Sequence, residues 1–113
     1  MKYMLMIYED DGDRVANMDE RMPTCAAYAD AMKKAGIYVT GDRLYGVDTG
    51  ATVRVAAGRT HVVDGPYAEA KEQLGGFHII DVPDLDTALA WAARCPSASR
   101  GAVEVRPIWP YEG

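Results

Sequence analysis

The segment from Lys2 to Tyr8 is apolar on both of its alternating faces, which is the strongest constraint on how this chain can fold. One face carries Tyr3, Leu5 and Ile7, and the other carries Met4, Met6 and Tyr8. A strand with one solvated face would alternate apolar and polar residues, whereas a strand that is apolar on both faces has to be covered on both. The sequence therefore predicts a sheet with cover on each side.

The rest of the chain predicts the element order β-α-β, hairpin, β-α-β. Residues Glu9 to Glu20 are acidic and contain glycine, so we expect a loop there. We expect helices from Pro23 to Ala35 and from the N-cap Asp84 to a stop at Pro96, and further strands at Ile37–Val39, Thr52–Val55, Thr60–Val63, Gly76–Val82 and Ala102–Ile108. Gly36 is placed to end the first helix.

This order indicates an α+β fold, a ferredoxin-like sandwich with an inserted β-hairpin and two helices on one face of a mostly antiparallel sheet. Helical spacing predicts that Tyr28, Met32, Leu85 and Leu89 are buried between the helices and the sheet. Two helices cover one face only, so the second apolar face of the first strand predicts a homodimer that stacks sheet on sheet.

Length and charge narrow the class of protein. At 113 residues we expect one domain spanning 1–113, and the net charge of −5 without a basic face argues against direct nucleic-acid binding. There is no apolar run of membrane-spanning length and no signal peptide, which predicts a cytoplasmic protein. Cys25 and Cys95 have no metal-ligand or redox-motif spacing, and we expect both to be small buried hydrophobic residues.

The stretch DGPYAEAKEQLGGFHIIDVPDLDTALAWAARCP, from Asp64 to Pro96, together with VEVRPI near the end, resembles the bacterial DGPF family, a branch of the YCII-related proteins. The resemblance extends over essentially the whole chain, including MKYMLMIYED at the start. It implies a ferredoxin-like domain that forms a dimeric α/β barrel. Some relatives resemble small-molecule enzymes, including a dehydrochlorinase-type lyase, and others are encoded near extracytoplasmic-function sigma factors.

Two departures from the family pattern affect the site. Tyr67 stands where the family name has Phe, so the ring gains a hydroxyl. Enzyme-like relatives place a His near the first helix, paired with an acid, but no His occurs between Arg21 and Asp30. That dyad cannot be transferred to this chain.

The candidate catalytic residues are Asp64, Glu72 and His78. Asp64 precedes a rigid Gly-Pro corner, where its carboxylate either acts as a general base or accepts hydrogen bonds from the turn. Glu72 would move a proton at the edge of a cleft, or it belongs to a solvated surface turn. An imidazole such as that of His78 carries protons near neutral pH, although a strand histidine is often structural.

The candidate ligand-binding residues are Tyr67, Lys71 and Arg106. Lys71 would hold an anionic substrate, and the planar fork of Arg106 would hold a carboxylate or an acidic side chain. No residue pattern indicates a metal or another cofactor. We therefore expect a small polar or anionic molecule in a cleft near the DGPY turn, with cofactor-free lyase or isomerase chemistry. The alternative is a non-catalytic sensor or protein-interaction module that acts with an extracytoplasmic-function sigma factor.

Overall fold

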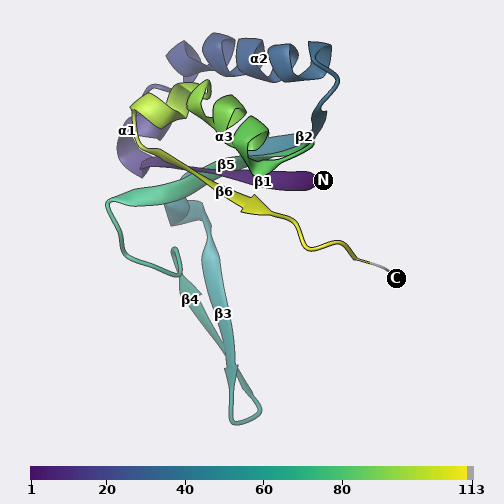
Figure 1. The fold of residues 1–113 in the computed structure, drawn as a ribbon. Coiled ribbons are helices and arrows are strands. Elements are labelled where there is room, and N and C mark those ends of the chain that lie inside the picture. Colours follow the sequence, from purple (N-terminus) through teal and green to yellow (C-terminus); the bar gives the residue numbers. More distant parts are fainter. Residues whose placement is uncertain (112–113) are drawn as a thin grey trace.

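The computed structural model describes residues 1–111, which form a four-stranded antiparallel sheet with helices on one face and a separate two-stranded hairpin (Figure 1). The strands of the sheet are β1 (Lys2–Asp10), β2 (Tyr38–Arg43), β5 (Glu72–Asp81) and β6 (Ala102–Pro107), in the spatial order β2-β5-β1-β6. The α-helices are α1 (Asp11–Ala16), α2 (Met18–Lys34) and α3 (Leu85–Ala93), and the short 3-10 helices are η1 (Val47–Thr49) and η2 (Pro96–Ser99). The hairpin pairs β3 (Ala51–Ala56) with β4 (Arg59–Asp64). This α+β architecture is consistent with the expected ferredoxin-like fold.

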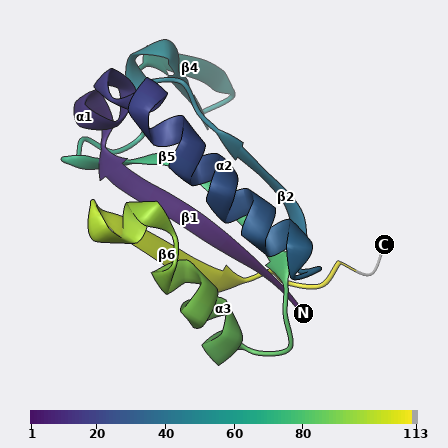
Figure 2. The same cartoon turned by 90° about the horizontal axis from the view of Figure 1, so that it is seen from above.

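Helices α2 and α3 lie side by side over the same face of the sheet (Figure 2). The core between them and the sheet contains Leu5, Met32, Ile80 and Ala88, all with no exposed surface. Removing these side chains from water is the main favourable term in folding. As predicted, Tyr28 and Met32 belong to this core.

The prediction that Leu85 and Leu89 are buried was wrong, because each is 46% exposed. Helix α3 instead buries its small residues, Ala88 and Ala92. Alanine side chains let a helix axis approach the sheet closely, and the rotation that achieves this turns the two leucines outward.

The loop predicted over Glu9 to Glu20 was also wrong. Strand β1 runs on to Asp10, whose side chain caps α1 by accepting a hydrogen bond from the Asp13 backbone N–H at 2.9 Å. Four acidic residues of this segment lie in the first turns of the two helices, where their negative charge interacts favourably with the positive end of the helix dipole. They are Asp11 and Asp13 in α1 and Asp19 and Glu20 in α2. Pro23 consequently lies inside α2 and not in its first turn.

The helix ends and the hairpin follow their expected chemistry. Asp84 caps α3 by accepting from the Thr87 N–H at 2.8 Å, and Gly36 ends α2 with a φ of +74°. In the hairpin turn, Ala57 and Gly58 both have positive φ, which is the geometry of a two-residue type I′ turn. The hairpin extends away from the sheet on the side opposite the helices (Figure 1).

Among the described residues, no helix is long and apolar enough to cross a membrane.

Candidate functional site

A cavity of about 420 Å³ lies between α2 and the helix-covered face of the sheet, and we call it the α2 cavity. Its walls come from β1, α1, α2, β2, β5 and η2, together with Cys95 just before η2. The apolar lining includes Ile7, Met18, Met22, Pro23, Ala26, Ala29 and Pro96, and the polar or ionisable lining includes Glu9, Arg14, Arg21, Cys25, Tyr28, Tyr38, Asp42, Arg43, His78, Cys95 and Ser97. A volume of this size with an apolar wall and a few polar groups is typical of small-molecule sites.

His78 is carried into the α2 cavity by β5, the strand between β2 and β1. Alternation along β5 places it on the helix-covered face, as does Ile80, which has no exposed surface. The ring of Tyr28 meets the imidazole edge-on with 5.6 Å between centroids, and the ring of Tyr38 lies at 6.1 Å. The Nδ1 atom of His78 is buried without a hydrogen-bond partner. Burial lowers the pKa of His78, which therefore favours the neutral imidazole.

Gly41 on β2 makes room for this imidazole. It is the direct register partner of His78, and a Cβ added at Gly41 would collide with His78 Nδ1 and lie 2.8 Å from the Phe77 carbonyl oxygen. A real side chain cannot occupy that position without moving the ring. The glycine is therefore part of what fixes the position of His78.

A buried ionic network joins the ends of β1, α2 and η2 at the wall of the α2 cavity. Glu9 is 4% exposed, and its carboxylate accepts hydrogen bonds from Arg21 and, at 2.7 Å, from the Ser97 hydroxyl. The Arg21 guanidinium also donates to Asp13 Oδ2 at 2.7 Å. Burying a carboxylate is expensive unless it is paired and hydrogen-bonded, and Glu9 meets both conditions.

Arg14 brings a second buried charge to the cavity wall. It is 4% exposed, donates to the Leu44 carbonyl oxygen at 3.0 Å, and forms an ion pair of 3.2 Å with Asp11. Gly75, where β5 bulges relative to β1, lies against its guanidinium, and a Cβ there would overlap the Arg14 side chain. The first glycine of the GGF segment thus admits the Arg14 side chain, and the second, Gly76, lies against the backbone of β2.

Two further ionisable groups of the cavity, the Cys95 thiol and the Tyr28 hydroxyl, favour their neutral forms. Burial raises the pKa of the Cys95 thiol, and burial is also the main reason why the pKa of Tyr28 is raised. The Tyr28 hydroxyl donates to the Trp91 carbonyl oxygen at 2.6 Å, which ties α2 to α3. Cys25 and Cys95 are both free thiols in the cavity wall.

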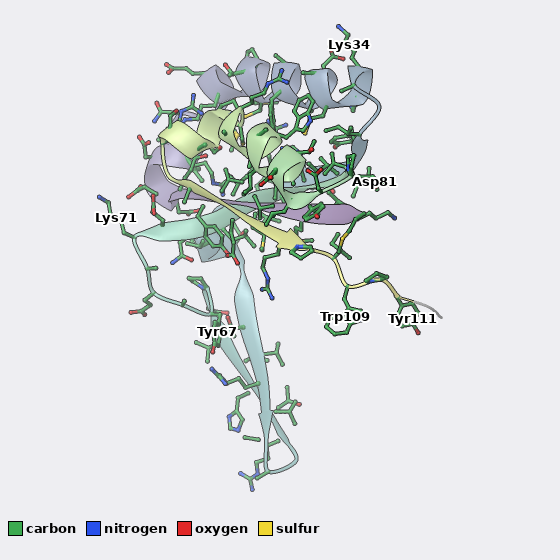
Figure 3. All side chains as sticks on the ribbon, in the orientation of Figure 1. Lys34, Tyr67, Lys71, Asp81, Trp109 and Tyr111 are labelled. Carbon is green, nitrogen blue, oxygen red and sulfur yellow. The ribbon has the colours of Figure 1, made fainter. Side chains whose placement is uncertain are left out.

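Of the six residues predicted from the sequence, His78 is the one that the structure places in the α2 cavity. Lys71 and Glu72 line a separate, shallow surface hollow with Tyr8, Asp10, Ala70, Arg100 and Ala102, which we call the Lys71 hollow. Asp64 is exposed at the end of β4. Tyr67 is 75% exposed and carries the Arg54 guanidinium over its ring at 5.1 Å. Figure 3 shows Lys71 beside the sheet and Tyr67 lower, next to the hairpin.

Arg106 lies on the other face of the sheet. It is the register partner of Met4 in β1, so the two side chains share a face of the sheet. The residues on either side of Met4, Tyr3 and Leu5, face the helices, and Met4 and Arg106 therefore face away from them. The contact of Arg106 Nε with Glu104 Oε2 is long, at 4.0 Å, and both side chains are largely exposed. The six predicted residues therefore occupy four different places on the molecule: the α2 cavity, the Lys71 hollow, the region of the hairpin and the other face of the sheet.

Sequence reasoning missed Glu9, Arg14, Arg21 and Ser97 as site residues. Glu9 and Arg14 fell in a segment interpreted as a loop, and the Glu9–Ser97 contact spans 88 positions of the chain. The usable signal was Glu9 itself, because alternation from Tyr3 through Leu5 and Ile7 places this acid on the apolar, inward face of β1.

Comparison with known proteins places this chain in a family. The YCII-related domain matches residues 1–112. The chain belongs to the YCII-related family. An uncharacterised protein of Rhizobium meliloti (strain 1021) is 40% identical over 118 residues, a match that covers 99% of this chain and 95% of that protein.

A solved structure shares the fold of this YCII-related protein. It is the 5-chloro-2-hydroxyhydroquinone dehydrochlorinase from Burkholderia phenoliruptrix AC1100, in complex with 2,5-dihydroxybenzoquinone. The TM-score is 0.57 at 16% sequence identity, and the match covers 99% of this chain and 96% of that one. At this level of identity the similarity concerns the fold.

Proposed function

We propose that this YCII-related protein binds a small molecule with an apolar ring and polar substituents in the α2 cavity, and acts on it by cofactor-free acid/base chemistry of the lyase or isomerase type. The observation that carries the proposal is a cavity of about 420 Å³ with an apolar wall, whose polar lining includes the His78 imidazole and the three arginines Arg14, Arg21 and Arg43. Arginine side chains recognise anionic oxygen atoms, and apolar walls accept a ring.

The comparison with the solved dehydrochlorinase supports this reaction class. That enzyme shares the fold and was captured with a hydroxylated quinone, a ring that carries carbonyl and hydroxyl oxygens. A ligand of this kind matches both the apolar wall and the polar groups of the α2 cavity.

Thermal denaturation in the presence of 2,5-dihydroxybenzoquinone and a panel of six-membered-ring carbonyl compounds tests the proposal. A ligand at 100 times its Kd stabilises the folded state by about 2.7 kcal/mol. Ala29 lines the cavity, so Ala29→Leu should fill part of it and weaken the shift, whereas Ala27→Leu on the exposed side of α2 should not. Equal shifts in both variants, or no shift with any compound, would contradict binding in this cavity.

We also propose that the protein is a homodimer of the DGPF type, in which two sheets form an α/β barrel. On the sheet face opposite the helices lie Met4, Met6, Phe77 and Ile79, all half-buried, although the helices cover only the other face. Beyond this face the hairpin presents Val53, Val55 and Val62 with 59–69% exposure. Apolar surface of this extent on a small domain is typical of an interface.

The hairpin valines also favour the second candidate, a module that acts with an extracytoplasmic-function sigma factor. Val53, Val55 and Val62 lie on one face of the hairpin, far from the α2 cavity, and form a surface on which a protein partner could pack. The test is the self-association of Val55→Thr, measured by light scattering. Weaker self-association would assign the valines to the homodimer interface, and an unchanged dimer would leave them available to another partner.

A further inference from the structure

We propose that His78 acts in the α2 cavity as a neutral hydrogen-bond donor, presenting its Nε2–H to a carbonyl or enolate oxygen of the bound ring. This inference rests on the proposed function, because it names the chemistry that the same cavity recognises. It differs from the expectation, stated from the sequence, that the His78 imidazole carries protons or is structural.

The position of the proton follows from the surroundings of the two ring nitrogens. Nδ1 is buried against Gly41 on β2, and among the described residues no acceptor reaches it. A proton on Nδ1 would be a buried N–H group without an acceptor, and such orphaned donors are rarer in folded proteins than acceptors with an unused lone pair. The favoured tautomer of the neutral ring therefore carries its proton on Nε2.

Nε2 is the nitrogen that is open to the cavity. Nε2 forms no hydrogen bond with a described residue. Unlike Nδ1, it is not fully buried, and because His78 lines the cavity, its exposed surface faces cavity space. The edge-to-face contact with Tyr28 and the tilted contact with Tyr38 restrict the plane of the ring. A fixed ring with one open N–H is a directional donor.

Among the described residues that line the cavity, no unpaired carboxylate lies on the same sheet face as His78 to serve as a counter-ion for an imidazolium. The titratable or charged groups that line it, besides His78, are Glu9, Arg14, Arg21, Cys25, Tyr28, Tyr38, Asp42, Arg43 and Cys95. Glu9 is already bonded to Arg21 and Ser97, and the Tyr28 hydroxyl is bonded to Trp91. Asp42 is an exposed residue whose register partner, Phe77, belongs to the opposite face. A second proton on His78 would thus add positive charge to a cavity already lined by three arginines, without an available carboxylate on the same sheet face.

A neutral imidazole donor selects a particular class of ligand. The Nε2–H group strengthens the binding of a ligand that has an oxygen acceptor and does not strengthen the binding of a ligand with an ammonium group. The donor strengthens its bond as negative charge accumulates on the bound oxygen, so it favours ligands with a polarised carbonyl or an enolate oxygen over those with a neutral hydrocarbon group. His78 therefore polarises the bound oxygen and does not itself act as a base.

Nitrogen-15 NMR of the imidazole tests the tautomer without any ligand. The chain has two histidines, and His61→Gln removes the signal of the other one. The substitution should not disturb the cavity, because His61 lies on the exposed hairpin strand β4. We expect the Nε2-protonated tautomer at pH 8. A dominant Nδ1-protonated tautomer would overturn the inference, and the binding proposal would stand.

A matched pair of probes tests the donor directly. Acetophenone and α-methylstyrene have nearly the same shape, but only acetophenone offers a carbonyl oxygen. We expect wild-type protein to prefer acetophenone by about fivefold to tenfold, the range of one net hydrogen bond. His78→Phe, which keeps a ring between the two tyrosines, should abolish the preference, and His78→Gln, which keeps an amide donor, should retain part of it.

The outcomes separate the two proposals. If both probes bind wild-type protein and His78→Phe keeps the preference for acetophenone, the donor role of His78 is wrong while the cavity remains a binding site. If neither probe binds and Ala29→Leu behaves as wild-type protein with every ring compound, the binding proposal fails and the donor role fails with it.

Discussion

The hydroxyl of Ser97 in η2 donates a 2.7 Å hydrogen bond to the buried carboxylate of Glu9 on β1. This contact connects the two ends of the chain, because η2 immediately precedes the last strand and β1 is the first. The Arg21 guanidinium binds the other oxygen of the same carboxylate. Three elements are thus joined at one acid that lines the α2 cavity.

Ser97→Ala should destabilise the protein by about 1.5–3 kcal/mol, because a hydrogen bond to a buried charged group is lost. The matched control is Ser99→Ala in the same 3-10 helix, where an exposed hydroxyl donates to the Pro96 carbonyl oxygen. That change should stay within about 0.5 kcal/mol. Urea denaturation of both variants measures the unfolding free energies. Equal losses of unfolding free energy would show that the Ser97–Glu9 hydrogen bond stabilises the protein no more than the exposed bond of Ser99 does.

Gly41→Ala should destabilise the protein by about 1–3 kcal/mol, because the new Cβ would overlap His78 and approach the backbone of β5. Gly12→Ala in α1 is the matched control, since a Cβ there meets only Asp10 Oδ1 at 3.7 Å. Replacing a helical glycine by alanine should stabilise by about 0.5–1 kcal/mol. Thermal melts should therefore move in opposite directions for the two variants.

The stability of the protein should fall in acid partly through His78. Its pKa is lowered by burial in the folded state, so below the ordinary value near 6.5 the unfolded chain binds a proton that the folded chain does not. The contribution is complete above that pH and is lost as the pH falls toward the lower folded pKa. His78→Phe should flatten the fall in unfolding free energy between about pH 7.5 and pH 5.5. A slope identical to that of wild-type protein would rule out this source.

The proposed dimer should depend on the open sheet face. Met6 lies on that face, so Met6→Lys would place a charge in the interface and should yield monomers by light scattering. Leu85→Lys provides a control on another apolar surface, because Leu85 is 46% exposed on α3. Monomers from Leu85→Lys and dimers from Met6→Lys would place the interface on the helices instead.

Local patterns predicted the elements well and the site poorly, for physical reasons that particular residues illustrate. Period-two alternation, the Asp84 cap and Gly36 at the end of α2 act within a few residues, so they can be recognised in the sequence. Helix α1 was missed because aspartates and a glycine suggest a loop unless Asp10 is recognised as a cap. The contacts of Glu9 with Ser97 and of Gly41 with His78 depend on tertiary packing, which leaves no local pattern.

The last prediction concerns the AEAKEQ segment, whose charges exceed what a turn requires. Lys71 and Glu72 line the Lys71 hollow with Arg100, and the α2 cavity is lined by other residues. If the ring compound binds in the α2 cavity, Lys71→Ala should leave its Kd unchanged within about twofold and the unfolding free energy within about 0.5 kcal/mol, because Lys71 is exposed. Ala29→Leu should weaken the same ligand, and isothermal titration calorimetry measures both. A loss of affinity in Lys71→Ala, with Ala29→Leu unaffected, would return the ligand to the edge of the DGPY loop. Tyr67 and Lys71 would then have the binding roles, and Glu72 the catalytic role, that the sequence first indicated.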